Sequence, residues 1–128
     1  MISFSIARRK GILWIRVHLS IAEENLKRLD AERAVMLERE GMMDLIVDFT
    51  DYVRGPIDSR LTRRRAAMPS PAPGRRRVYV APDDHLFGMM RMYAIPHDDP
   101  KVEVVRSVGE AFDAFDVSEE DFEDVPVT

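Results

Sequence analysis

Three aspartates are the residues of this chain best placed for chemistry. Asp48 lies near the end of an apolar run over residues 45–49, a pattern typical of a central strand in a parallel sheet. Open α/β sheets bind ligands at the carboxyl ends of their strands, so Asp48 is the first candidate for acid–base or ligand chemistry. Asp51 and Asp83 lie in turns from which they can approach it. The alternative is that all three carboxylates cap turns and helices through backbone amides.

The three histidines predict no metal site. His18, His85 and His97 are far apart, and none has a partner at metal-ligand spacing. His97 begins a His-Asp-Asp run, but Pro96 and Pro100 enclose it, which predicts a solvated turn. His85 follows two aspartates, yet no nucleophile is implied beside it. The glycines stand singly, outside both common phosphate-loop patterns. We therefore assign no catalytic residue and expect a non-enzymatic protein without a metal or cofactor.

A second candidate surface is apolar. The helix predicted over residues 84–93 has a buried stripe at spacing i, i+3, i+4, i+7, made of Leu86, Met89, Met90 and Tyr93. Phe87 and Met92 lie off that stripe. Methionine packs adaptably and is common at apolar binding surfaces, so these two residues are candidates for contact with a hydrophobic ligand or a second subunit. The alternative is that the whole stretch packs in the core.

Size and composition bound the class of protein. A chain of 128 residues with 45% hydrophobic content fits one globular domain. No apolar run approaches the roughly 20 residues of a membrane helix, so no membrane insertion is expected. The absence of cysteine excludes disulfides and thiolate zinc sites. Without a signal-peptide pattern at the start, we expect a cytoplasmic protein.

Charge is divided unevenly along the chain. Residues 54–77 hold eight arginines and one acid, whereas residues 107–128 hold eight acids and no Lys or Arg. One interpretation is a nucleic-acid surface with an acidic tail. The other, which we favour, is that the two regions face each other or solvate the surface. Nucleic-acid binding is therefore not expected.

Local patterns predict a hairpin followed by alternating helices and strands. Strands are expected over residues 2–6, 12–17, 45–49, 77–80 and 102–105, with helices over 20–39, 58–68, 84–93 and 108–115. Ser20 and Glu23 form a capping-box pattern, Asp58 can cap the second helix, and Gly41 ends the first. Arg33 interrupts the apolar stripe of the first helix and is expected at its edge. The order ββαβαβαβα predicts an α/β fold with a mixed sheet. Residues 1–117 are expected to form a single domain and residues 118–128 an acidic tail.

Three segments carry a resemblance to a known family. Residues 45–49 look like its central strand with a terminal acid. Residues 78–93 look like its strand, Asp-containing turn and Gly-Met-Arg helix, and residues 102–111 look like its closing strand and last helix. On these segments the chain resembles the STAS superfamily, and most closely its SpoIIAA-like stand-alone bacterial domains. The similarity covers about residues 2–116.

The resemblance implies a sheet whose helices favour one face, and an interaction or regulatory role. Members of the superfamily mostly bind proteins, and some bind nucleotides or lipids. The SpoIIAA switch is a phosphorylated serine, and Ser59 stands at roughly that place, although Arg60 and Leu61 follow where the motif has Ser and Gly. We therefore expect a STAS-like interaction module that forms a homodimer or binds another regulatory protein. The alternative is a binder of a small hydrophobic, lipid-like or nucleotide-like ligand between the sheet and the helix over residues 84–93.

Overall fold

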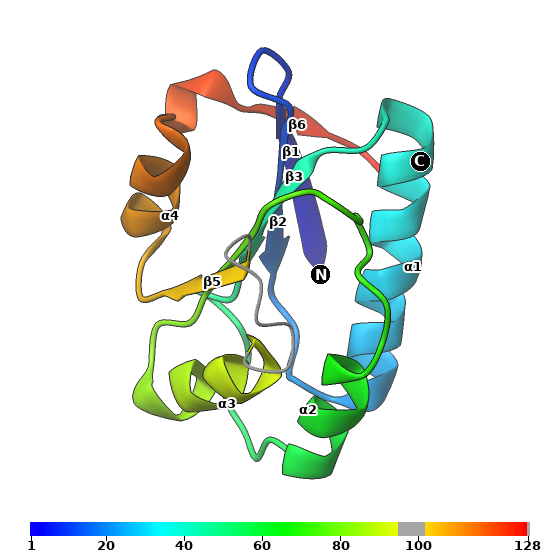
Figure 1. Cartoon of the computed structure of the whole chain (residues 1–128), viewed down its shortest axis with the longest axis vertical. Helices are drawn as coiled ribbons and strands as arrows, with labels where there is room; N and C mark the ends of the chain where they lie inside the picture. The colour runs from blue at the N-terminus through cyan, green and yellow to red at the C-terminus, as the bar shows by residue number, and fades with distance from the viewer. Residues whose placement is uncertain (95–101, 128) are drawn as a thin grey trace.

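Strands and helices alternate along the chain after an N-terminal hairpin (Figure 1). The computed structural model describes residues 1–94 and 102–127. Its elements are β1 (Ile2–Ala7), β2 (Ile12–Val17), α1 (Glu23–Glu40), β3 (Asp44–Asp48), α2 (Ser59–Ala66), β4 (Arg77–Val80), α3 (Asp84–Ala94), β5 (Val102–Val105), α4 (Val108–Phe115), the 3₁₀ turn η2 (Glu119–Asp121) and β6 (Glu123–Val125). No helix within the described ranges is long and apolar enough to cross a membrane.

The strands form one six-stranded mixed sheet in the order β5-β4-β3-β2-β1-β6. The strands from β2 to β5 pair in parallel, while β1 runs antiparallel to both β2 and β6. The predicted α/β class, the hairpin and the parallel later strands are therefore confirmed. Parallel strands need crossover connections, and α1, α2 and α3 supply them between β2, β3, β4 and β5.

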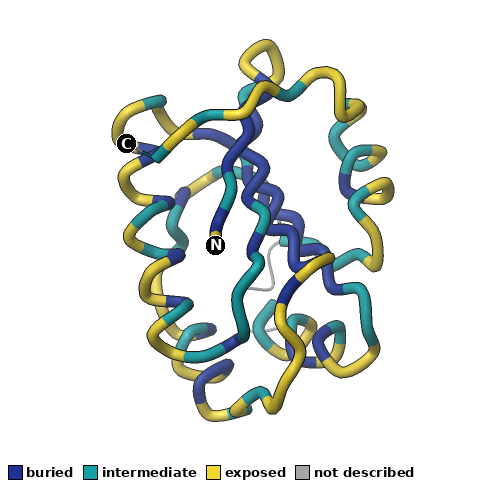
Figure 2. Tube along the Cα trace, turned by 180° about the vertical axis from the view of Figure 1, so that it is seen from behind, coloured by how far each residue is buried: buried dark blue, intermediate teal, exposed yellow. Residues whose placement is uncertain are grey.

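Two apolar cores lie on opposite faces of the sheet, because successive side chains of a strand point to opposite sides. On one face the larger core joins the sheet to α1 and to parts of α2 and α3. On the other face Ala111, Phe112 and Phe115 of α4 pack against a core that includes Trp14 and Val78. Figure 2 shows the strands from β1 to β4 as the buried centre and the outer turns of the helices as exposed. Helices α1, α2 and α3 therefore lie on one face and α4 on the other, so the second face is covered over these strands.

Helix ends follow the expected signals in two cases and depart from them in one. Asp58 caps α2 by accepting a hydrogen bond from the Arg60 amide, and Gly41 ends α1 with φ of 95°. The predicted capping box is wrong: α1 begins at Glu23 without a side-chain cap. Ser20 lies outside the helix, where it bridges to Val53 and its hydroxyl accepts from the Asn25 amide group.

The acidic C-terminal segment contributes the edge strand β6, which the sequence did not predict. Ser5 of β1 donates to Asp124 at 2.6 Å, and Arg16 of β2 donates to both of these side chains. These bonds lower the pKa of Asp124, with the Ser5 hydroxyl as the main cause and Arg16 as the second. Arg39 of α1 donates to the backbone carbonyls that follow β6. The segment therefore ties the sheet edge to α1.

Candidate ligand-binding site

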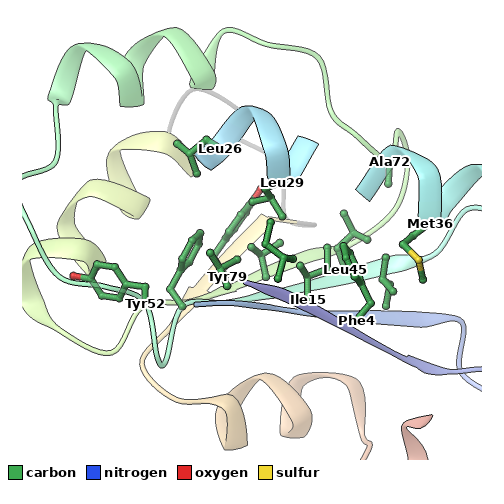
Figure 3. Close-up of a cluster of buried hydrophobic side chains, with 14 of the residues drawn as sticks. Phe4, Ile15, Leu26, Leu29, Met36, Leu45, Tyr52, Ala72 and Tyr79 are labelled. Atoms are coloured by element: carbon green, nitrogen blue, oxygen red, sulfur yellow. The ribbon is translucent and has the colours of Figure 1, made fainter. Parts of the chain in front are cut away.

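A cavity of about 40 Å³ lies between α1, α2, α3 and the sheet. That is room for roughly three water molecules. Its wall is mostly apolar, and its polar groups come from α1, α2, α3 and β4: Arg33, Thr62, Arg65, Tyr79 and Tyr93. Figure 3 shows Leu26 and Leu29 of α1 above Tyr79 of the sheet. An apolar cavity with a few convergent polar groups is the usual form of a small-ligand site.

The periodicity of each element places these side chains. Leu26, Leu29 and Arg33 recur at i, i+3 and i+7 along α1, so they share the face turned to the sheet. Alternation along β4 puts Arg77 and Tyr79 on that same face. Arg33 is buried with 8% of its surface exposed. The expectation that it lies at the edge of the stripe is therefore wrong, because Asp30 on the previous turn supplies a partner for its charge.

One carboxylate holds two arginines at the cavity wall. Arg33 donates to Asp30 Oδ1 at 2.8 Å, and Arg65 donates to the two Asp30 oxygens at 2.6 Å and 3.0 Å. The Arg65 pair is bidentate, the geometry in which a guanidinium binds a carboxylate most strongly. It links α2 to α1 across the cavity. Asp30 itself is half-buried, with 26% of its side chain exposed.

A third arginine lies deeper and is paired differently. Arg77 is 2% exposed, and its Nη1 donates to the hydroxyls of Tyr79 and Tyr93 at 3.1 Å each. Within residues 1–94 and 102–127 no carboxylate forms an ion pair with it. Burial raises the pKa of the Tyr79 hydroxyl, and the neighbouring Tyr93 raises it further, while the charges of Arg77 and Arg33 oppose the shift. Tyr79 is therefore a neutral hydroxyl at ordinary pH.

The cluster of Arg33, Arg65, Arg77 and Asp30 carries an excess of positive charge. Among residues 1–94 and 102–127, the three guanidinium groups of the cluster are balanced by one carboxylate, which leaves two positive charges near the cavity. Buried charges are normally paired, because removing an ion from water costs several kcal/mol. A cavity with this surplus can bind and orient an anion or a hydrogen-bond acceptor. This cluster was not predicted from the sequence, although Arg33 within the apolar stripe of α1 indicated a buried charge.

The structure engages Asp48 in local hydrogen bonds. Its Oδ2 accepts from the Trp14 indole at 3.0 Å, and its Oδ1 accepts from the Thr50 amide at 2.9 Å and from the Thr50 hydroxyl. Asp48 is 5% exposed and lies on the α4 face, opposite the cavity. Its carboxylate stabilises the turn that follows β3.

Asp83 caps α3. Its Oδ1 accepts from the Leu86 amide at 2.8 Å and its Oδ2 from the Tyr52 hydroxyl at 2.7 Å. These two bonds, the amide first, lower the pKa of Asp83. Burial, followed by the bond to Asp83, raises the pKa of Tyr52 to about 12. Asp51 is exposed, and no hydrogen bond of the described side chains brings it together with Asp48 or Asp83.

The other predicted site residues lie outside the cavity wall. Phe87 is half-buried, and the guanidinium of Arg106 lies 3.9 Å from its ring centroid. Met92 is 37% exposed, and Ser59 is the half-buried first residue of α2. Neither Phe87 nor Met92 lines the cavity, although Met90 and Tyr93 of the same helix do.

No three histidine, aspartate or glutamate side chains of the described ranges gather as a metal site, and residues 97–99 lie outside those ranges. Comparisons of this chain with protein-family models, curated proteins and solved structures find no match.

Proposed function

We propose that this chain is a non-enzymatic binding domain that takes a small ligand into the cavity between α1, α2, α3 and the sheet. The observation that carries the proposal is the convergence of Arg33, Arg65 and Tyr79 on one mostly apolar cavity. Polar groups that converge on an apolar cavity fix the orientation of a bound molecule, while the apolar wall supplies most of the binding energy.

Binding fits the remaining chemistry of the molecule better than catalysis does. Asp48 and Asp83 already accept hydrogen bonds at both of their oxygens, so neither is a free base. Tyr79 keeps its proton, because burial raises the pKa of its hydroxyl. The guanidinium groups of the cavity are permanently charged, which suits recognition rather than proton transfer.

The resemblance to SpoIIAA-like STAS domains supports a regulatory setting for such binding. The hairpin-first α/β order is compatible with that group, and we propose membership on the segments quoted above. Similarity of fold does not identify a specific ligand, so the ligand has to be inferred from the cavity itself.

Ligand binding is tested with the purified chain and two probes small enough for a cavity of about 40 Å³, propan-1-ol and propanoate. We expect at least one of them to raise Tm and to appear as a bound mass in native mass spectrometry. Leu61 lines the cavity from α2 and is 7% exposed, so Leu61→Phe fills the space and should abolish binding. Circular dichroism of Leu61→Phe checks that the fold is intact. If neither probe binds to the native chain, the proposal is refuted.

A protein-interaction role is the second candidate, because large apolar side chains are exposed near α2 and α3. Val53 before α2, Met68 after it and Met92 in α3 are 55%, 46% and 37% exposed. Self-association predicts a solution mass that rises with concentration and falls in Met92→Glu. A constant monomer mass for both proteins would refute the homodimer.

Phosphorylation of Ser59 would add charge at the start of α2, and mass spectrometry of the protein from its own cells tests it.

A further inference from the structure

We infer that the ligand of the cavity is an oxyanion with a short apolar body, and that its carboxylate or phosphate group binds Arg33 and Arg65 in competition with Asp30. The inference rests on the proposed function and names the chemical class of the ligand. Its basis is the charge balance and the geometry of the arginines at the cavity wall.

The charge balance favours an anion over a neutral molecule. Arg33 and Arg65 line the cavity. Arg77 does not line it, but donates to the hydroxyls of two residues that do, Tyr79 and Tyr93. Among the described residues, Arg33 and Arg65 share one carboxylate, Asp30, which leaves one positive charge in surplus at the cavity wall. A bound anion removes that surplus from a poorly solvated site, where charge–charge attraction is stronger than in water.

Asp30 already occupies the position that a ligand oxyanion would take. Both nitrogens of the Arg65 fork donate to it, and one of its oxygens also receives Arg33. A carboxylate or phosphate offers the same pair of acceptor oxygens at the same spacing. Because 26% of the Asp30 side chain is exposed, it can turn outward into water when a ligand replaces it.

The apolar body follows from the rest of the wall. Leu26, Leu29 and Val47 line the cavity beside the arginines, and none of them offers a hydrogen bond to a polar ligand. An inorganic anion would leave these side chains without contact. An acyl carboxylate or an organic phosphate uses both parts of the site.

The test compares propanoate, propan-1-ol and inorganic phosphate by isothermal titration calorimetry. With the propanoate carboxylate at the position of Asp30, its two remaining carbons fit a cavity of about 40 Å³. Propanoate should bind the native chain about tenfold or more tightly than propan-1-ol, because only propanoate carries the charge that the arginines attract. Phosphate should compete with propanoate but bind more weakly. If propan-1-ol binds as tightly as propanoate, the inference is overturned and the proposed function stands, whereas no binding of any probe would refute the proposed function. If phosphate binds more tightly than propanoate, the ligand has no apolar body and the inference is overturned.

Two variants and one control locate the anion. Asp30→Asn removes the competitor and should tighten propanoate binding about tenfold, with propan-1-ol unchanged. Arg65→Gln should weaken propanoate binding about tenfold. Arg64→Gln is the matched control, because Arg64 is 60% exposed on the same helix and should change propanoate affinity by less than about twofold. Weaker propanoate binding in Asp30→Asn would show that Asp30 organises the arginines rather than competing, and would overturn the inference.

Discussion

Replacing Arg77 by methionine is expected to leave the protein as stable or slightly more stable, although it deletes two hydrogen bonds. The Arg77 guanidinium is 2% exposed and has the hydroxyls of Tyr79 and Tyr93 as its hydrogen-bond acceptors, each at 3.1 Å. Methionine keeps the apolar stem and similar length but needs no solvation. Tyr79 and Tyr93 also contact each other, with their hydroxyl oxygens 3.3 Å apart, so neither hydroxyl depends on Arg77 alone.

The expected magnitude follows from two opposing contributions. Burying an ion without a counter-ion costs several kcal/mol even after the protein relaxes. Hydrogen bonds of a charged guanidinium return about 1.5–3 kcal/mol each, so the two bonds offset most of that cost. The difference predicts that Arg77→Met raises the free energy of unfolding by about 0–1 kcal/mol. For a chain of this size, each kcal/mol raises Tm by about 4 °C.

Urea denaturation with an unchanged m value, together with a thermal melt, measures the effect. Arg76→Met is the control from the adjacent position. Arg76 is half-buried and pairs with Glu103, so its loss should destabilise the fold by about 1 kcal/mol. If Arg77→Met lowers the free energy of unfolding as much as the control does, the two hydroxyls satisfy the buried charge. The reasoning about an uncompensated positive site would then be wrong.

Three further outcomes follow from hydrogen bonds outside the cavity. Trp14→Phe should cost about 2 kcal/mol, because it leaves one oxygen of the buried Asp48 without its donor; a double-mutant cycle with Asp48→Asn that gives no coupling would refute this. The lowered pKa of Asp83 means that its contribution to stability is present above pH 4 and is lost as pH falls through the folded pKa. Asp83→Asn should therefore flatten the acid limb of the stability curve, and parallel curves for both proteins would contradict the assignment. Tyr52, whose pKa is raised to about 12, contributes stability that is present below pH 10 and is lost as pH rises toward 12. Absorbance titration at alkaline pH should show a tyrosine that titrates near pH 12, besides the still later Tyr79, and this step should disappear in Tyr52→Phe. An unchanged titration would refute the assignment.

Local pattern predicted most of the elements, because each depends on neighbours in sequence. The strands over residues 12–17, 77–80 and 102–105 match the structure at both ends. Their signals are short apolar runs between turns, which need no knowledge of distant residues. The predicted start of the first helix was wrong, because Ser20 forms a β-bridge with Val53, which lies 33 positions later in the sequence.

Features that depend on distant pairing could not be read from local pattern. β6 is held by Ser5 and Arg16, which lie more than a hundred positions before Asp124. An acidic segment of this kind has low intrinsic strand propensity, so its place in the sheet comes from those partners. The covering of the second sheet face by α4 likewise depends on how Phe112 meets Trp14, with ring centroids 5.1 Å apart.

The arginines of residues 54–77 show where a sequence signal for the candidate site was present. On α2 the buried residues Leu61, Thr62 and Ala66 mark the inward face, and Arg65 lies four positions after Leu61 on that face. Arg63 and Arg64 lie on the outward side and are exposed. A count of charge over the segment does not distinguish these arginines, whereas the helical period places Arg65 on the inward face of α2 and Arg63 and Arg64 on the outward face. Arg33 of α1 stands at a core position by the same rule. Arg33 and Arg65 stand at core positions of two separate helices and share a single carboxylate, Asp30. Buried charges are normally paired one to one, and this imbalance is the physical argument for the ligand class proposed above.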